Sequence, residues 1–293
     1  MRTYPTSTPA THAPPAPRLY SGRPHEQGHS VDLGLSEKVA LVGGSSRGLG
    51  KACALALAED GARVVVCARD RQALDEAAGE IRERTGAEVL AVAADLASAE
   101  GVEQVVARTV EQFGGVDVLV ANSGGPPPGL FADLDDHAWR HGFEVVTLSF
   151  VRFVRAALPH MRTRGWGRII AIQSMSVKEP VAFLDLSNGI RPGVAGLVKA
   201  LMPDLARDGI TINLVLPGMF LTSRINPALK DEPDELDPAV EAELAPLAQT
   251  VPMGRLGHPR ELAALVAFLA SERASYITGA AYQVDGGRIR SNV

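Results

Sequence analysis

Tyrosine, cysteine and long apolar runs are all scarce in this chain of 293 residues. Its two cysteines, Cys53 and Cys67, lie inside short apolar runs, so we expect core residues and neither a disulfide framework nor a metal site. No apolar stretch approaches the roughly 20 residues of a membrane-spanning helix. The formal net charge of −5 gives no electrostatic reason to expect nucleic acid or an anionic membrane as a partner. This charge suits a soluble cytoplasmic protein.

The first 31 residues differ in composition from the rest of the chain. They contain six prolines and almost no branched apolar residues, so they cannot bury enough apolar surface to offset the entropy of ordering. Their arginines and hydroxyl side chains faintly resemble an organellar transit peptide, but the prolines are incompatible with an amphipathic helix. We therefore expect a disordered tail over residues 1–31 and one folded unit over residues 32–293.

Short apolar runs alternate with segments of helical periodicity from residue 38 onward. The runs are apolar throughout, which is typical of strands covered on both faces. Strands that alternate with helices form right-handed βαβ units, so the pattern predicts an α/β fold with a doubly wound parallel sheet. The expected strands are Lys38–Gly43, Arg63–Ala68, Glu88–Ala93, Val116–Ala121, Arg168–Ile172 and Ile210–Leu216, and the expected helices include 49–59, 71–84, 133–162 and 188–207.

The junction between the first strand and the first helix is rich in glycine, with the sequence Gly43-Gly44-Ser45-Ser46-Arg47-Gly48-Leu49-Gly50. Such a turn lets the backbone approach a pyrophosphate, and the following helix presents free N–H groups and a partial positive charge to it. Glycines alone are weak evidence because turns need them anyway. A strand, a glycine-rich turn, a helix and a second strand in this order, however, favour dinucleotide binding.

This loop and several later segments resemble the short-chain dehydrogenase/reductase family over nearly all of residues 36–287. The loop is similar to the family's G-x-x-x-G-x-G cofactor turn, and Asp95-Leu96 is similar to the pair that contacts adenine. Residues 121–124 are similar to the family's N-N-A-G segment. Residues 217–222 are similar to the P-G-x-x-x-T stretch that holds the nicotinamide amide. The resemblance implies a Rossmann-type seven-stranded parallel sheet in one domain, with a lid insertion at about residues 219–250. It implies cofactor contacts from Gly44, Ser46, Arg47, Gly48, Leu49, Gly50, Arg69, Asp95, Leu96, Asn122, Gly124, Arg191, Pro217, Gly218, Phe220 and Thr222.

The end of the second strand indicates which nicotinamide cofactor is used. An NAD site usually places a carboxylate there for the ribose hydroxyls, and that carboxylate would repel the 2′-phosphate of NADP. This chain has Ala68 at the aligned position, followed by Arg69, and it has Arg47 in the glycine-rich loop. Two guanidinium groups around one phosphate favour NADPH, although a shifted turn would aim Asp70 at the ribose instead, and both arginines are also compatible with plain surface charges.

The catalytic positions are where the chain departs from the family. The family places a serine after the fifth strand, a Tyr-x-x-x-Lys pair at the start of the next helix, and an asparagine in the preceding helix. Ser174 matches the serine, whereas Ser187 stands at the tyrosine position, Arg191 at the lysine position and Thr147 at the asparagine position. We take Ser174, Ser187 and Arg191 as the candidate catalytic residues, and no group of residues has the spacing of metal ligands.

A dedicated proton donor is therefore missing from the predicted site. No tyrosine occurs between residues 21 and 275, and Tyr276 and Tyr282 fall in the family's C-terminal segment. A serine is a much poorer acid than a tyrosine, and an arginine stays protonated near neutral pH, so Ser187 and Arg191 can orient a carbonyl and stabilise its negative charge without supplying the proton. A ketone beside a phenol carries its own proton, and the Ser-x-x-x-Arg replacement resembles atypical ketoreductases of aromatic polyketides, including the angucyclinone type.

Three functions are compatible with these residues. The first is an NADPH-dependent ketoreductase acting on a bulky, polycyclic, phenolic ketone. The second is a catalytically silent NADP-binding sensor or partner subunit, and the third is a dehydratase or cyclase on the same scaffold. The retained Ser174 and the basic Arg191 favour the first. The histidines His137, His141 and His160 are expected to be surface or packing residues. The family pairs two long helices, here 133–162 and 188–207, across subunit interfaces, which implies a homodimer or homotetramer.

Overall fold

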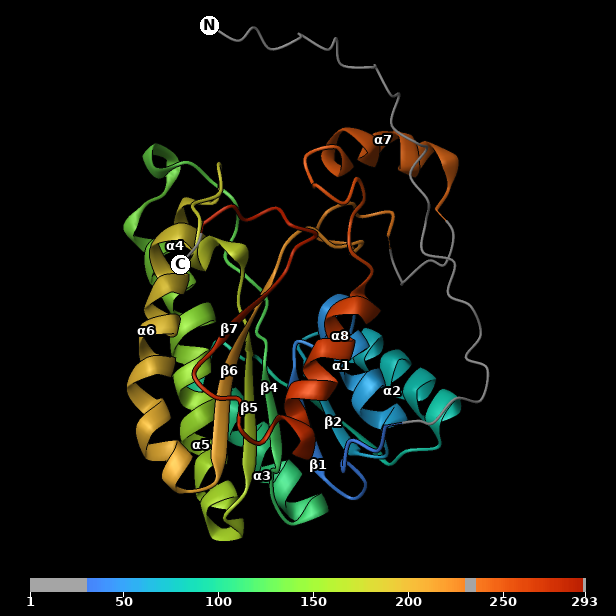
Figure 1. Cartoon of the computed structure of the whole chain (residues 1–293), viewed down its shortest axis with the longest axis vertical. Helices are drawn as coiled ribbons and strands as arrows, with labels where there is room; N and C mark the ends of the chain where they lie inside the picture. The colour runs from blue at the N-terminus through green and yellow to red at the C-terminus, as the bar shows by residue number, and fades with distance from the viewer. Residues whose placement is uncertain (1–30, 230–235, 292–293) are drawn as a thin grey trace, which may run out of the picture.

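Seven parallel strands form one sheet in a computed structural model of the chain, which describes residues 31–229 and 236–291 (Figure 1). The strand order is β3-β2-β1-β4-β5-β6-β7, so the winding direction reverses between β1 and β4, where sheets of this type form a crevice at the carboxyl ends of the strands. The predicted fold is thereby confirmed. The strands are β1 (Val39–Gly43), β2 (Arg63–Ala68), β3 (Val89–Ala93), β4 (Val118–Ala121), β5 (Gly167–Ile172), β6 (Ile210–Pro217) and β7 (Ala281–Val284).

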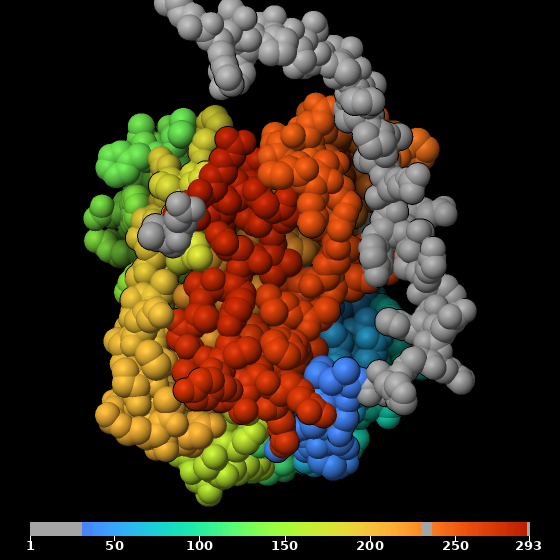
Figure 2. Space-filling view, viewed as in Figure 1, coloured from blue at the N-terminus to red at the C-terminus, as the bar shows by residue number. Residues whose placement is uncertain are grey.

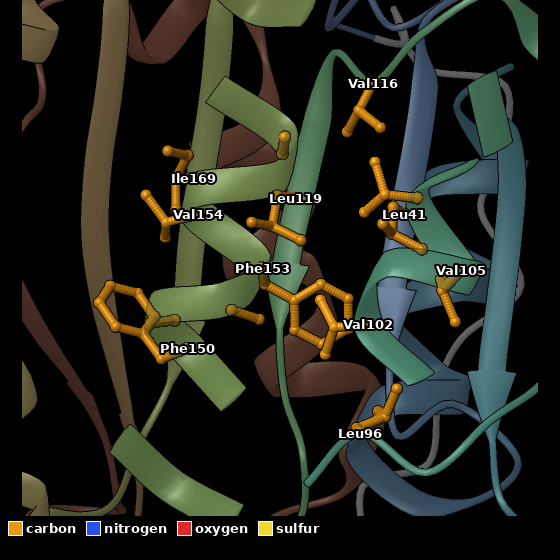
Figure 3. Packing of buried hydrophobic residues seen from close by; sticks show 14 of the residues in the cluster. Leu41, Leu96, Val102, Val105, Val116, Leu119, Phe150, Phe153, Val154 and Ile169 are labelled. Atoms are coloured by element: carbon orange, nitrogen blue, oxygen red, sulfur yellow. The ribbon is translucent and has the colours of Figure 1, made fainter. Parts of the chain in front are cut away.

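Two layers of helices cover the two faces of this sheet (Figure 1). One face packs against α1 (Gly48–Glu59), α2 (Arg71–Thr85) and α8 (Pro259–Ala270), and the other packs against α3 (Ala99–Phe113), α5 (Ser149–Arg164) and α6 (Asp185–Arg207). Figure 3 shows the second face, where Phe150 and Phe153 of α5 pack against strand residues such as Leu119 and Ile169. Because both faces are buried, the strands are apolar throughout, as the sequence indicated.

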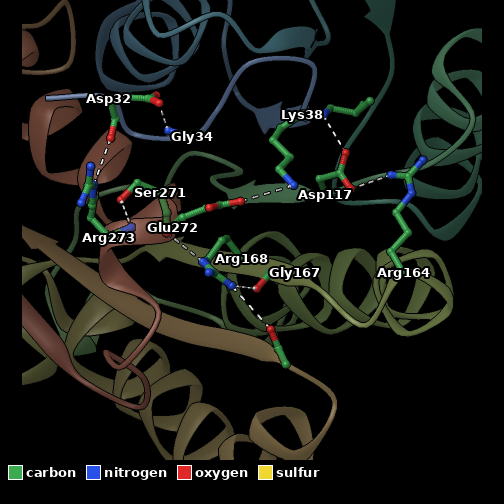
Figure 4. A network of polar contacts seen from close by, with 12 residues as sticks. Asp32, Gly34, Lys38, Asp117, Arg164, Gly167, Arg168, Ser271, Glu272 and Arg273 are labelled. Carbon is green, nitrogen blue, oxygen red and sulfur yellow. Dashed lines mark hydrogen bonds and ion pairs between the residues drawn. The ribbon is translucent and has the colours of Figure 1, made fainter. Parts of the chain in front are cut away.

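The amino-terminal ends of the central strands are fixed by charged side chains (Figure 4). The carboxylate of Asp117 accepts from the backbone N–H of Val39 at 2.8 Å and from Nη1 of Arg164 at 2.7 Å, so it connects β1 to the end of α5. Nearby, the cationic groups of Lys38 and Arg168 lie 4.1 Å and 4.3 Å from the ring centroid of Trp166. A single cation–π contact of this type contributes about 0.5–1 kcal/mol at an exposed site. These contacts lie at the end of the sheet opposite the crevice.

The segment expected to be one helix over 133–162 is divided. A short 3₁₀ turn, η1 (Phe131–Asp133), precedes α4 (Asp136–Phe143), and a π-helical turn, η2 (Glu144–Leu148), separates α4 from α5. A π turn shifts the hydrogen-bond ladder by one residue and is frequent at functional sites. Here the hydroxyl of Ser123, beyond the end of β4, donates to the Val145 carbonyl, so the loop after β4 is bound to the π turn.

The insertion after β6 contains α7 (Pro238–Ala248), which Figure 1 shows beyond the carboxyl ends of the strands. It has a small apolar cluster of its own, formed by Leu221, Leu229, Leu244, Val251 and Leu256. In the space-filling view the C-terminal segment, coloured red, runs over the surface between the α6 and α7 regions (Figure 2). The backbone N–H of Arg290 in this segment donates to Glu179 at 3.0 Å. That this insertion acts as a lid remains a prediction.

Two sequence expectations fall partly or wholly outside the described residues. The expected tail over 1–31 is described only at Val31, and residues 230–235 of the insertion expected at about 219–250 are not described. Within residues 31–229 and 236–291, no helix combines the length and the apolar character that crossing a bilayer requires.

Candidate active site

The glycine-rich loop leaves the amino terminus of α1 open to a ligand. Arg47 occupies the N-cap position, but its side chain makes no capping bond, and the first turn carries no acidic residue. The unsatisfied N–H groups and partial positive charge of this helix end are the features that bind a pyrophosphate. Gly44 adopts a left-handed φ of +57°, and a Cβ at Gly50 would overlap the Gly44 carbonyl oxygen, so the close turn depends on glycine at both positions.

One buried and one partly buried polar side chain hold this loop in place. The hydroxyl of Ser45 donates to the Val42 carbonyl at 2.7 Å and accepts from the Cys67 backbone N–H at 2.9 Å, which connects the loop to β2. The side-chain amide of Asn122 donates to the carbonyls of Gly43 and Gly44 at 3.1 and 3.3 Å. Asn122, predicted to contact the cofactor, is therefore positioned to support the loop, and direct contact remains a prediction.

A cavity of about 420 Å³ at the crevice gathers many of the predicted cofactor residues. It lies between the glycine-rich loop, the ends of β2 and β3, and the loop after β4, and Arg224 and His141 complete its wall. Its size is within the range of small-molecule sites. The predicted residues that line it are Gly44, Ser46, Arg47, Arg69, Asp95, Leu96 and Gly124.

The other predicted cofactor residues are not among those that line this cavity. Gly48 and Gly50 shape the first turn of α1, where Leu49 lies half-buried, and a Cβ at Gly48 would lie 3.4 Å from the Thr222 methyl group. Pro217 ends β6, and Gly218 packs against Asp285. The ring of Phe220 is buried against Gly257, beside a different hollow.

Arg47 and Arg69 both line the cavity, together with Asp70. Asp70 does not point freely at a ribose site. One carboxylate oxygen caps α2 by accepting from the Ala73 N–H at 3.1 Å, and the other pairs with Nη2 of Arg47 at 3.2 Å. Both charged side chains of this pair are about half exposed, so the pair contributes little to stability and can yield to a phosphate.

The three candidate catalytic residues lie at the start of α6 and at the end of β5. Ser187 is 6% exposed, and its Oγ lies 2.9 Å from Oγ of Ser176 and accepts from Nε of Arg191 at 3.0 Å. Ser174 is more exposed, and its Oγ accepts from the backbone N–H of Ser176 at 3.2 Å. In the described part of the chain the Ser174 O–H has no acceptor, so it is available to donate to a carbonyl oxygen.

Arg191 is buried among neutral acceptors. Besides Ser187, it donates from Nη1 to Oε1 of Gln173 and from Nη2 to the carbonyl of Gly124, both at 3.2 Å. Three of its five N–H groups are thereby used, which leaves two for a bound molecule. Burial, and next the charge of Arg224, lower the pKa of Arg191 to about 10, so the side chain is still protonated at neutral pH, as expected.

Thr147, at the position of the family's asparagine, lies in the π turn and is 6% exposed. Its hydroxyl has no hydrogen-bond partner among the described residues. Tyr276 is fully exposed and Tyr282 belongs to β7. Tyr4 and Tyr20 lie outside the described residues. The same described residues bring no three His, Cys, Asp or Glu side chains together in a way that could hold a metal ion.

Several site residues were not anticipated from the sequence. Gln173 and Ser176 flank Ser174, and their role as partners of Arg191 and Ser187 depends on how β5 meets α6. Arg224 lies two residues beyond the P-G-x-x-x-T stretch, and this closeness to a predicted cofactor motif was the sequence feature that could have indicated it. His141, expected to be a surface or packing residue, lines the cavity and stacks on His137 with ring centroids 6.5 Å apart.

Comparison with known proteins places the chain in a family. Residues 44–288 match the family model described as enoyl-(acyl carrier protein) reductase. The chain is 37% identical to 3-oxoacyl-[acyl-carrier-protein] reductase of Vibrio cholerae, over 87% of this chain and 98% of that protein. It is 36% identical to a putative ketoacyl reductase of Streptomyces coelicolor, over 85% of this chain and 96% of the relative.

Solved structures agree with this placement. L-sorbose reductase from Gluconobacter frateurii, crystallised with NADPH and L-sorbose, has a TM-score of 0.82 and 35% identity, covering 89% of this chain and all of that one. A single-residue variant of actinorhodin polyketide ketoreductase with NADPH has a TM-score of 0.79 and 36% identity, covering 87% and 98% of the two chains. Together with the seven-stranded sheet and the glycine-rich loop, these matches establish that the chain belongs to the short-chain dehydrogenase/reductase family.

Proposed function

We propose that the chain is an NADPH-dependent ketoreductase whose substrate is a polycyclic aromatic ketone with a neighbouring phenol. The observation that carries this proposal is the network of Ser176, Ser187 and Arg191, which occupies the position of the family's tyrosine and lysine and contains no phenolic hydroxyl to serve as the dedicated proton donor. The relatives named as reductases, and the neighbours crystallised with NADPH, support the general activity.

The residues present fit nicotinamide adenine dinucleotide phosphate. The open end of α1 and the tight turn at Gly44 suit the pyrophosphate, and Arg47 and Arg69 suit the 2′-phosphate in the same cavity. Of the remaining predicted contacts, Asp95, Leu96 and Gly124 line this cavity, and Thr222 lies beside Gly48. When bound, NADPH supplies the hydride that reduces the carbonyl carbon.

The chain's own groups hold the carbonyl and stabilise its charge. In this proposal the free O–H of Ser174 donates to the carbonyl oxygen, and the two unused N–H groups of Arg191 are available to the ribose or to the developing negative charge. Ser187 is occupied by Ser176 and Arg191, so it positions the guanidinium. The proton then comes from the substrate's own phenol, which is hydrogen-bonded to the ketone.

Turnover on a matched pair of ketones tests this proposal. We expect 8-hydroxy-1-tetralone, or a tricyclic analogue with the same arrangement, to be reduced with oxidation of NADPH, and its methyl ether to be reduced at least tenfold more slowly. Similar rates for the two would show that the protein supplies the proton. Tight NADPH binding without oxidation on any such ketone would favour the silent sensor or partner subunit instead.

Two further properties belong to the proposal. The family's pairing of α5 and α6 across subunit interfaces supports a homodimer or homotetramer, which sedimentation would measure. A cytoplasmic location fits the composition and the reductase relatives. It can be tested by fractionating cells that express the full chain.

A further inference from the structure

Two guanidinium groups converge at the loop after β4. Nη2 of Arg191 and Nη2 of Arg224 lie 2.9 and 3.1 Å from the point that a Cβ at Gly125 would occupy. The absence of a side chain at Gly125 gives both groups access to the same space. Arg191 comes from α6 and Arg224 from the insertion after β6, so the convergence is produced by the fold and not by sequence proximity.

Neither guanidinium is neutralised within the described residues. Arg191 donates only to a hydroxyl, a side-chain amide and a backbone carbonyl, and Arg224 donates from Nη2 to the Pro126 carbonyl at 3.0 Å. No carboxylate of residues 31–229 or 236–291 lies within 4.0 Å of either one. Two like charges this close are unfavourable, and after burial the charge of Arg224 is the second cause that lowers the pKa of Arg191. An anion between them would remove the repulsion.

The carboxylates of the adjoining cavity are already engaged. Asp70 pairs with Arg47 and caps α2, and Asp95 accepts from the Ala97 N–H at 3.1 Å. Arg224 lines the same cavity, next to Gly125 and His141. The wall between the predicted cofactor cavity and the candidate catalytic residues is therefore positively charged.

We propose that Arg191 and Arg224 form a two-arginine site for a phenolate oxygen of the substrate. The inference rests on the proposed function and deepens it. As hydride from NADPH adds to the ketone carbon, the carbonyl electrons pass to oxygen, which takes the proton of the neighbouring phenol. The products are an alcohol, NADP⁺ and a phenolate, and the phenolate regains a proton from water on release. The two arginines stabilise that phenolate, so the substrate's phenol replaces the tyrosine as the acid.

Ionisation of a bound phenol measures this site directly. 1-Hydroxyanthraquinone carries a phenol beside a ketone, and its absorbance reports its ionisation; NADP⁺ in place of NADPH prevents reduction. We expect wild-type protein to increase the acid dissociation constant of the bound probe about tenfold or more. Arg224→Gln should abolish most of this increase, and Arg224→Lys should keep part of it. An unshifted probe on wild-type protein, or equal shifts for wild type and Arg224→Gln, would overturn the proposal.

A matched control uses an arginine on the same helix. Arg207→Gln removes an exposed charge at the far end of α6, about 24 Å along the helix from Arg191, and should leave probe ionisation unchanged. 1-Methoxyanthraquinone, which cannot ionise, gives the absorbance change caused by binding alone. A loss of ionisation in Arg207→Gln equal to that in Arg224→Gln would show that net charge alone is responsible, which also contradicts the site.

The cofactor's pyrophosphate is another oxyanion that Arg224 could bind. If it does, Arg224→Gln should weaken NADPH and NADH equally and leave probe ionisation unchanged, an outcome that overturns the substrate assignment. The proposed function fails separately. Probe ionisation that depends on Arg224, without turnover of any phenolic ketone, would sustain the anion site and refute the reductase. Turnover that depends on the phenol, with no change in the ionisation of the bound probe, would support the reductase and refute the anion site.

Discussion

Oγ of Ser187 lies 2.9 Å from Oγ of Ser176 and accepts from Nε of Arg191, so this hydroxyl is enclosed between two protein groups. Ser174 has the opposite arrangement, because its Oγ only accepts and its O–H is unused among the described residues. For the two serines that the sequence placed together in the catalytic set we therefore propose different tasks. Ser174 has an O–H available for a substrate, and Ser187 orients Arg191.

Alanine variants should separate these tasks. Arg191→Ala removes a donor to the developing charge and should lower kcat about 10²–10³-fold, with part of the loss in cofactor binding. Ser174→Ala should lower kcat with little change in cofactor affinity. Ser187→Ala should be milder than both, and it should shift the pH profile because the bond to Nε of Arg191 is lost. Complete inactivity of Ser187→Ala with normal binding would mean that Ser187 donates the proton.

Cofactor selectivity should depend on Arg47, Arg69 and Asp70. Replacing both arginines by alanine removes charge-assisted bonds worth about 1.5–3 kcal/mol each and should weaken NADPH far more than NADH. Asp70→Asn should act in the opposite direction, since it frees Arg47 from its ion pair and removes a negative charge near the phosphate. Titration of both cofactors against each variant is the measurement. Equal losses for the two cofactors in the double variant would contradict the 2′-phosphate assignment.

Substitutions at the amino-terminal ends of the strands, opposite the crevice, should affect the stability of the fold. Asp117 is buried and accepts from both Val39 and Arg164, so Asp117→Ala should lower the free energy of unfolding by about 2–3 kcal/mol. Asp208→Ala breaks a surface ion pair with Arg162 and should cost less than about 1 kcal/mol. Urea unfolding of the two variants makes the comparison. Equal costs would mean that the bond from Asp117 to Val39 adds nothing.

The fold was predictable because the strands are buried on both faces and their apolar runs are bounded by glycine and helical segments. Arg63–Ala68 forms β2 within the predicted bounds, and the other expected strands differ by one or two residues at their ends. The π turn at Glu144–Leu148 was not predictable, because it is a single turn with one helical segment before it and another after it, and no residue type marks it. The seventh strand was predicted only from the family resemblance and not from an apolar run.

The candidate site was predictable where one motif carries it and not where distant segments meet. The glycine-rich loop is local, so Gly44, Ser46 and Arg47 were found together and line one cavity. Arg224 was missed because its approach to Arg191 depends on the path of the insertion after β6. Asn122 was assigned to the cofactor by its motif, whereas its side chain binds the loop carbonyls. Contacts of this kind become visible only once the strands are placed side by side.

The pH dependence of turnover should report the charge of Arg191. Burial and the neighbouring Arg224 lower the pKa of Arg191 to about 10, so the guanidinium is charged at neutral pH and loses its proton as the pH rises through about 10. Turnover should therefore be level through neutral pH and fall above about pH 10. Arg224→Gln removes a repelling charge and should move this fall in turnover to higher pH.

The lysine in Arg191→Lys starts from an ordinary pKa of about 10.4 and is subject to the same burial and repulsion, so the fall in turnover of this variant should come at lower pH. Turnover measured from pH 7 to 11, with circular dichroism at each pH to confirm folding, gives the profiles. A fall at the same pH in wild type and both variants would show that another group limits the reaction.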